Sequence, residues 1–410
     1  MALQTMDHDD TKPSLASLLM RSTELKRALV DFAVSPRYER HLARFMEEAG
    51  HHGRVLPEDE AINGIDRFAL QHRMPGGGTV LSRFLASRPD LTAPDREMLH
   101  GWAEPVEGIF EICRKDRDSL VLLNLIDDLE YRAYSNVGPS VFRPLPLRGY
   151  VLARLVPIRP VPDVWLVSGT MSAYPESDAA QIAEAALKLA MRLPELVYRN
   201  PKSLERGWKQ MREDRAAFVE FFGRDEVVLP PAEAEERLNA YYRHREEATL
   251  ARQPARHRRR NLPGVDVPAF KFPPDLAGAD TVGMIYDETD GLNFYSEYGM
   301  LRELFADAAL AAGKPYADVL MGYLREATIG PLPFRRLAAA HPDTADQVFR
   351  QALRQPRFTW AEHGETLMRR RKPWYYKREP RPGFTVIGAR LSELLGRQPG
   401  QAAPDSTRRS

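Results

Sequence analysis

The chain has 410 residues, of which 43% are hydrophobic and 28% charged, which is ordinary for a globular protein of two or three domains. Its 58 Lys and Arg residues balance 57 Asp and Glu residues, so the net charge of +1 does not by itself indicate a polyanionic partner. A single cysteine, Cys113, excludes a disulfide framework and every cysteine-based metal site.

The residues before position 104 show the periodicity of amphipathic helices. Apolar residues recur at helical spacing over residues 14–34, and the Ser35-Pro36 pair is typical of the start of a second helix. Acidic residues follow Pro57, as the dipole of a third helix favours, and Thr92 is a typical cap for a later one. Helices are predicted over residues 14–34, 35–46, 57–72, 80–85 and 92–103.

The spacing of the apolar residues changes from a helical to a strand pattern after residue 104. Five short β-rich runs follow one another with turn residues between them, and this regular spacing predicts a small antiparallel β-barrel or curled sheet. The runs lie at residues 106–114, 120–126, 130–135, 150–158 and 164–169. Cys113 falls within the first run and is expected to be a small buried hydrophobic residue.

The second half of the chain is predicted to be mostly helical. Its most basic stretch, residues 252–261, is followed by four prolines, which favours a linker. Helices are predicted over residues 181–193, 201–222, 231–249, 298–306, 316–325, 331–340, 343–353 and 360–371, with one strand at 281–286.

These patterns predict an α+β protein with six regions. They are a helical N-terminal region at 1–103, a small antiparallel β-barrel at 104–175, helices packing on the barrel at 176–250, a basic Pro-rich linker at 251–278, a mostly helical C-terminal domain at 279–396 and a disordered tail at 397–410. The first 13 residues are polar and acidic, unlike a signal peptide, and no run of 18 apolar residues occurs. We therefore expect a cytoplasmic protein that does not enter a membrane.

Two basic clusters are candidate contacts for phosphate groups. The first contains Arg258, Arg259 and Arg260; the second contains Arg369, Arg370, Arg371, Lys372 and Lys377 together with Trp374 and Tyr375. Cations beside aromatic rings are suited to phosphate neutralisation and base stacking. The alternative is a solvated linker and a C-terminal segment whose rings pack on the core. The first hypothesis is thus a non-enzymatic binding or adaptor protein whose ligand is a nucleic acid or a protein partner.

An acidic turn supports a second hypothesis. Asp287, Glu288 and Asp290 follow a predicted strand, and carboxylates at the end of a strand can hold a divalent metal ion. The alternative function is therefore a metal-dependent phosphoryl-transfer or hydrolytic enzyme, although polar turn chemistry explains these residues equally well. Ser168 also ends a predicted strand, but the segment lacks the leading glycine of a nucleophile elbow, which argues against acyl transfer.

Several segments resemble known sequences. WAEPVEGIFEI at 102–112 and LLNLIDDLEYRAYSN at 122–136, with GLNFY at 291–295 and PLPFRRL at 331–337, resemble uncharacterised bacterial proteins from GC-rich lineages. The helical region and predicted barrel also resemble, distantly, the accessory region of proteins with a SecA-type C-terminal metal-binding motif. That motif needs several Cys or His ligands, which a chain with one cysteine does not supply. The resemblance implies an architecture over residues 60–395 and no chemistry.

Overall fold

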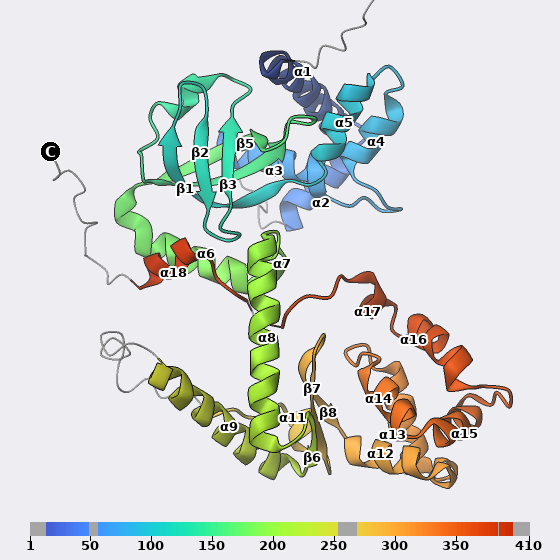
Figure 1. Cartoon of the computed structure of the whole chain (residues 1–410). Coiled ribbons are helices and arrows are strands. Elements are labelled where there is room, and N and C mark those ends of the chain that lie inside the picture. The colour runs from blue at the N-terminus through green and yellow to red at the C-terminus, as the bar shows by residue number, and fades with distance from the viewer. Residues whose placement is uncertain (1–13, 49–55, 253–268, 384, 397–410) are drawn as a thin grey trace, which may run out of the picture. The chain divides into compact units, whose positions relative to one another are not determined.

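The computed structural model describes residues 14–48, 56–252, 269–383 and 385–396 (Figure 1). The chain divides into two compact units, which we call unit 1 (Met1–Ser203 with Thr385–Ser410) and unit 2 (Leu204–Phe384). Both contain helices and strands, which confirms the α+β class. The division does not follow the predicted linker at 251–278, of which residues 253–268 lie outside the described part.

Unit 1 begins with a group of helices. Ser14 and Thr92 cap the first and the last of them, each by accepting a hydrogen bond from a backbone N–H of the first turn. Their apolar faces form one core that includes Leu29, Phe68 and Trp102. The helices are α1 (Leu15–Ala33), α2 (Glu39–Glu48), α3 (Glu58–Gln71), α4 (Val80–Ser87) and α5 (Ala93–Gly101).

The strands of unit 1 form one sheet. They are β1 (Val106–Lys115), β2 (Leu120–Asn124), β3 (Glu130–Tyr134), β4 (Tyr150–Pro157) and β5 (Val164–Tyr174). They pair in the order β1-β2-β3-β5-β4, and β4 pairs back with β1, so the order of pairing closes on itself. The pairing of β3 with β5 is parallel, which corrects the predicted fully antiparallel arrangement. A closed ring with an odd number of strands cannot alternate direction throughout, so one neighbouring pair must be parallel.

The side chain of Cys113 lies on the surface of this sheet. The pairing of β1 with β2 shifts register between Ile112 and Arg114, and Cys113 is exposed at this irregularity. The expectation that it is buried was therefore wrong. A bulge changes which side chains face the core, and the sequence pattern alone does not locate it.

The last helix of the described chain also belongs to unit 1. α18 (Ala389–Leu395) packs against α6 (Ala179–Arg192), which in turn contacts β1. Arg390 of α18 donates to both carboxylate oxygens of Glu111 at 2.5 and 2.8 Å. Asp128 accepts a hydrogen bond from the backbone N–H of Ala389 at 3.1 Å. Residues 385–396 therefore do not belong to the predicted C-terminal domain of 279–396. Unit 1 also contains α7 (Pro194–Val197) and the short 3-10 turns η1 (Pro139–Phe142) and η2 (Glu176–Asp178).

Unit 2 contains a three-stranded antiparallel sheet with the strand order β6-β7-β8. The first and third strands were not predicted. The helix predicted at 231–249 was expected to pack on the barrel. It packs instead on the first strand of this sheet and on a short helix at residues 274–277. The end of the predicted linker is also part of unit 2, because Phe270 and Phe272 pack in its core. These elements are α8 (Pro201–Phe222), β6 (Glu226–Leu229), α9 (Pro231–Arg252), α11 (Pro274–Ala277), β7 (Val282–Asp287) and β8 (Gly291–Ser296).

The remainder of unit 2 is helical. A second core, which includes Tyr298, Phe334 and Phe349, holds these helices against β7 and β8. They are α12 (Tyr298–Ala306), η3 (Ala308–Ala312), α13 (Lys314–Arg325), α14 (Leu332–Ala340), α15 (Pro342–Leu353), the π-helical turn η4 (Trp360–Gly364), α16 (Glu365–Arg371) and α17 (Pro373–Lys377). Among the helices that the structure describes, none has the length and apolar character needed to cross a membrane.

Candidate functional site

Unit 1 contains a cavity of about 600 Å³, a size within the usual range of small-molecule pockets. Two helices form one side of it, and β5 and the connection between β3 and β4 form the other. Most of the lining side chains are apolar. The lining residues are Lys26 and Val30 of α1; Ile62, Ile65 and Asp66 of α3; Ser135, Asn136, Val137, Val141, Pro144 and Leu145 of the connection; and Val167, Gly169, Thr170 and Met171 of β5.

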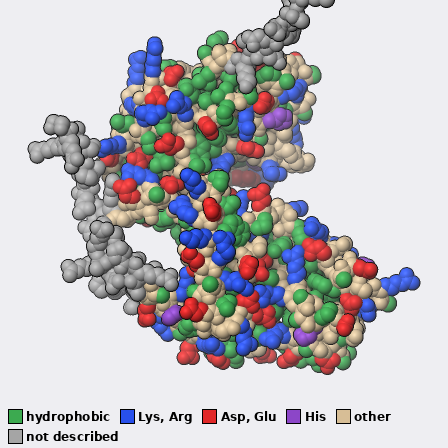
Figure 2. Space-filling view, in the orientation of Figure 1, with side chains coloured by type: hydrophobic (Ala, Val, Ile, Leu, Met, Phe, Trp, Pro, Cys, Tyr) green, Lys and Arg blue, Asp and Glu red, His purple; other side chains and the backbone are tan. Residues whose placement is uncertain are grey.

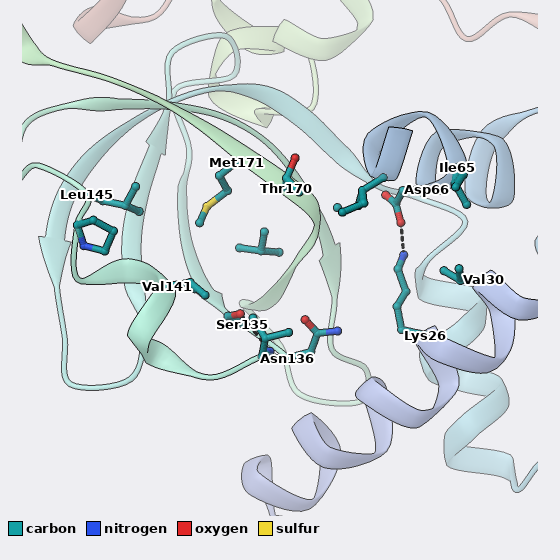
Figure 3. Close-up of a pocket in the computed structure, with 15 residues that line it drawn as sticks. Lys26, Val30, Ile65, Asp66, Ser135, Asn136, Val141, Leu145, Thr170 and Met171 are labelled. Carbon is teal, nitrogen blue, oxygen red and sulfur yellow. Dashed lines mark hydrogen bonds and ion pairs between the residues drawn. The ribbon is translucent and has the colours of Figure 1, made fainter. Parts of the chain in front are cut away.

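The pocket has a polar end and an apolar end (Figure 3). Lys26 and Asp66 face each other on the helix side. Val141, Leu145 and Met171 lie on the opposite side, where they pack with the interior of the five-stranded sheet. A molecule that fills this pocket therefore meets the charged pair on the helix side and, toward the sheet, mostly apolar side chains together with the uncharged Ser135 and Asn136.

Four buried polar side chains from four different elements converge at the polar end. Lys26 Nζ forms an ion pair with Asp66 and donates a hydrogen bond to Ser168 Oγ at 2.6 Å. Arg154 Nη1 donates to Asp66 Oδ2 at 2.7 Å, and Ser168 Oγ lies 2.9 Å from the same oxygen. The most exposed of the four, Lys26, has 8% of its surface accessible, so bulk water is largely excluded from this cluster.

Burial and charge have opposing effects on these groups. Burial lowers the pKa of Lys26 because desolvation disfavours the ammonium ion, and the charge of Asp66 only partly opposes this. Burial also acts to raise the pKa of Asp66, but the charges of Lys26 and Arg154 outweigh it and hold that pKa below its usual value. Asp66 is therefore a buried anion shared between two cations.

The turn of backbone beside the cluster depends on Gly169. This residue has φ +78°, and a Cβ there would lie 2.3 Å from Asn63 Oδ1. The same oxygen accepts a hydrogen bond from the backbone N–H of Thr170 at 2.9 Å, and Asn63 Nδ2 donates to Thr170 Oγ1 at 2.8 Å. Gly169 thus lets α3 approach β5 closely enough to form one wall of the pocket. Ser168, which the sequence analysis weighed as a nucleophile, is fully buried beneath this turn.

Sequence reasoning missed this site, although a signal was present. Lys26 lies between Leu25 and Leu29 on the buried face of α1, and Asp66 lies on the buried face of α3 beside Phe68. A single charged residue on the apolar face of a helix requires a partner. Searching for such residues would have identified two of the four members; Arg154 and Ser168 carry no comparable local signal.

The predicted basic-aromatic segment is only partly exposed. Arg369, Arg370 and Arg371 are exposed at the end of α16, as is Lys377. Lys372, in contrast, is fully buried. The first basic cluster, Arg258, Arg259 and Arg260, lies outside the described residues. Lys372 Nζ donates hydrogen bonds to the backbone carbonyls of Tyr323, at 2.7 Å, and Glu326. Lys372 is therefore not accessible for a phosphate contact, because it is fully buried and donates to two carbonyls inside unit 2.

The aromatic rings of this segment are half-buried. The Arg378 guanidinium lies over the rings of Trp374 and Tyr375, 5.2 and 5.4 Å from their centroids. Arg369 lies 4.5 Å from the centroid of Tyr376. Arginine side chains of the protein itself therefore occupy positions over these rings, which reduces the surface open to a stacked base. On the visible face of the molecule, basic and acidic side chains are interspersed (Figure 2).

The predicted metal ligands serve other contacts. Asp287 Oδ1 accepts hydrogen bonds from the backbone N–H groups of Thr289 and Asp290 at 2.8 and 3.1 Å, which stabilises the turn between β7 and β8. Glu288 is exposed. Within the part of the chain that the structure describes, no group of three or more His, Cys, Asp or Glu residues is arranged to hold a metal ion. The proposed set of Asp287, Glu288 and Asp290 therefore does not form a metal site.

The structure instead joins the two candidate sites that the sequence treated as separate. Asp290 accepts a hydrogen bond from the Tyr375 hydroxyl at 3.0 Å, and its other oxygen lies 3.6 Å from Arg378. Burial raises the pKa of Asp290, while Tyr375 and Arg378 oppose this shift. The acidic turn and the basic-aromatic segment are therefore partners of each other through Asp290.

No family model, curated protein or solved structure matches the chain. The resemblance to uncharacterised bacterial proteins accordingly stays a prediction. The function has to be argued from the geometry of the sites themselves.

Proposed function

We propose that the protein is a non-enzymatic binding protein whose ligand is a small, mostly apolar molecule with one polar group, held in the unit 1 pocket. The observation that supports this is the division of a cavity of about 600 Å³ into an apolar end and an end with two charged side chains. Small-molecule sites are typically apolar pockets with a few well-placed polar groups that fix orientation.

The state of the polar groups favours binding over catalysis. Ser168 Oγ is buried and engaged with Lys26 and Asp66, so it is not presented to a substrate in the pocket. A nucleophile must instead reach the reacting atom. In unit 2, the carboxylates of the alternative hydrolytic enzyme hold a turn and two neighbouring side chains. We further propose that the closed ring of five strands is the small barrel that the sequence predicts, with the apolar end of the pocket in its interior.

Binding of an environment-sensitive fluorophore, 1-anilinonaphthalene-8-sulfonate, tests the pocket. Ile62→Trp places a large ring at the partly exposed rim, and Val30→Phe fills space from α1. Each should weaken binding by about tenfold or more, equivalent to 1.4 kcal/mol.

Met191→Trp is the matched control, since Met191 is 65% exposed on α6 and does not line the pocket. It should bind the fluorophore as the unmodified chain does. Equal binding by all the variants, or no binding by the unmodified chain, would contradict the proposal.

A second candidate function is nucleic-acid binding by the end of α16. The observation that favours it is the row of three exposed arginines, Arg369, Arg370 and Arg371. If phosphate contacts hold the complex, binding to labelled single-stranded RNA or DNA should weaken steeply with salt. The double variant Arg370→Gln with Arg371→Gln should reduce the salt slope by about 1.4–1.8, since each phosphate contact contributes roughly 0.7–0.9.

The control for that experiment removes two other exposed cations of unit 2. Lys314→Gln with Arg357→Gln changes the net charge equally and should leave the salt slope unchanged. Absence of binding at low salt, or the same loss in both double variants, would remove this candidate and leave a protein partner as the alternative.

A further inference from the structure

The buried ion pairs at the polar end of the pocket contain more cations than carboxylates. Lys26 and Arg154 both pair with Asp66. Arg154 Nη2 also lies 3.3 Å from Glu107 Oε1, and Arg67 pairs with the same carboxylate. In the buried part of this network two cations, Lys26 and Arg154, thus share the carboxylate of Asp66, whereas Glu107 and Arg67 are partly exposed.

The charged groups of this network divide between two cavities, the second of which is also lined by Asp59 and Glu60. Glu107 and Arg67 line a separate cavity on the far side of Arg154, together with Arg154 itself. Of the five charged groups, only Lys26 and Asp66 line the pocket. Asp66 already receives Lys26, Arg154 and Ser168, so its charge is divided among several donors. Lys26 is therefore a buried cation that shares its one carboxylate with Arg154.

A ligand carboxylate would supply a second anionic partner for Lys26. An ammonium ion carries three N–H donors, and a charge-assisted hydrogen bond to a carboxylate is about twice as strong as a neutral one. In a site with little water, a second carboxylate beside Lys26 gains more than an alcohol does, and a cationic head group is repelled. Asp66 is the one carboxylate among the described residues that line the pocket, and Lys26, Arg154 and Ser168 already engage it; the lining side chains Ser135, Asn136 and Thr170 are uncharged.

We infer that the pocket selects a monocarboxylic acid with an aliphatic body, whose carboxylate lies beside Lys26 and whose chain lies against Val141, Leu145 and Met171. This rests on the proposed function, because it names the ligand class of the same pocket. The side of the pocket opposite Lys26 holds no charged lining residue, so Lys26 is the only cation that a ligand carboxylate can meet among the lining residues that the structure describes.

Three ligands with the same chain test this inference on the unmodified protein. Dodecanoate, dodecan-1-ol and dodecylamine differ only in the head group. Calorimetric titration below the micelle concentrations of the acid and the amine, and below the solubility limit of the alcohol, gives each affinity. Dodecanoate should bind roughly tenfold or more tighter than the alcohol, and the amine should bind most weakly. If the alcohol or the amine binds as tightly as the acid, while Ile62→Trp still blocks all three, the acid selectivity is wrong and the pocket remains. If none binds, the proposed function itself is contradicted.

A variant then tests the role of Lys26. Lys26→Met keeps the unbranched shape of the side chain, one atom shorter, and removes its charge, so the advantage of dodecanoate over dodecan-1-ol should fall to about threefold or less. Dodecan-1-ol serves as the internal check that the variant is folded, because its affinity should be retained. Lys188→Met, an exposed site on α6, should leave both affinities unchanged. An undiminished preference for the acid in Lys26→Met would overturn the assignment.

Discussion

The surroundings of the charged residues differ between unit 1 and unit 2. In unit 1, single charges on the apolar faces of α1 and α3 meet each other and Arg154 beneath a cavity. In unit 2, the acidic turn and the basic-aromatic segment contact each other: Asp290 accepts a hydrogen bond from Tyr375 and forms an ion pair with Arg378. The comparison teaches that an isolated charge in an apolar pattern is a better guide to a site than a run of like charges.

The largest effect should follow from removing the shared anion of unit 1. Asp66→Asn leaves Lys26 and Arg154 buried without their common carboxylate, and should lower the free energy of unfolding by about 3–5 kcal/mol. Urea denaturation measures the change. Asp90→Asn breaks the surface pair with Arg88 and should leave the unfolding midpoint nearly unchanged, because water and salt screen exposed pairs. Equal effects of the two substitutions would contradict the contrast between buried and surface charge.

A second buried carboxylate of unit 1, Asp127, accepts hydrogen bonds from uncharged donors, and no ion pair with a cation is found for it among the residues that the structure describes. Asp127 is 1% exposed, accepts hydrogen bonds from the Tyr131 hydroxyl at 2.6 Å and the Leu129 backbone N–H at 3.0 Å, and its backbone carbonyl accepts one from Asn200. Burial raises its pKa from 3.8 to about 6, while these hydrogen bonds act to lower it. Asp127 therefore tests what burial does to a carboxylate without the two cations that Asp66 has.

The raised pKa predicts a stability that falls with rising pH. Between about pH 4 and 6 the folded state retains the proton of Asp127 and the unfolded state loses it, so the free energy of unfolding should decrease by about 3 kcal/mol across this window and then level off. Asp127→Asn cannot titrate and should lack this component. Urea denaturation of both proteins from pH 4 to 7.5 gives the difference, and any packing cost of the amide is the same at every pH. A difference that stays constant with pH would contradict the prediction.

The smallest effect concerns the buried lysine of unit 2. Lys372→Met leaves the carbonyls of Tyr323 and Glu326 without their donor and should cost about 1–3 kcal/mol of stability. Burial also lowers the pKa of Lys372 to about 8, so it holds its charge less firmly than an exposed lysine. Lys377→Met, at an exposed position five residues later, is the control and should leave the unfolding midpoint unchanged. A weaker affinity for nucleic acid in Lys372→Met without a loss of stability would restore its predicted phosphate-binding role.

The sequence by itself determined most of the local structure. The helix at residues 14–34 and the five strands after residue 104 lie close to their predicted positions, because period, caps and turn residues act within a few positions of one another. The order of these elements also indicated the α+β class. The order of the elements could not indicate that β3 and β5 pair in parallel, because this pairing follows from the closure of a ring with an odd number of strands.

Only the tertiary structure decided where the pocket lies and which charges belong to it. Lys26 and Ser168 are 142 positions apart, Asp66 and Ser168 are 102 apart, and α18 reaches Glu111 from 279 positions away. Such contacts depend on how the apolar faces of whole elements pack, and no local pattern of residues records them. The same packing buried Lys372 and joined Asp290 to Tyr375, because a buried charge or a polar group is stable only beside a partner, and that partner is chosen by the fold.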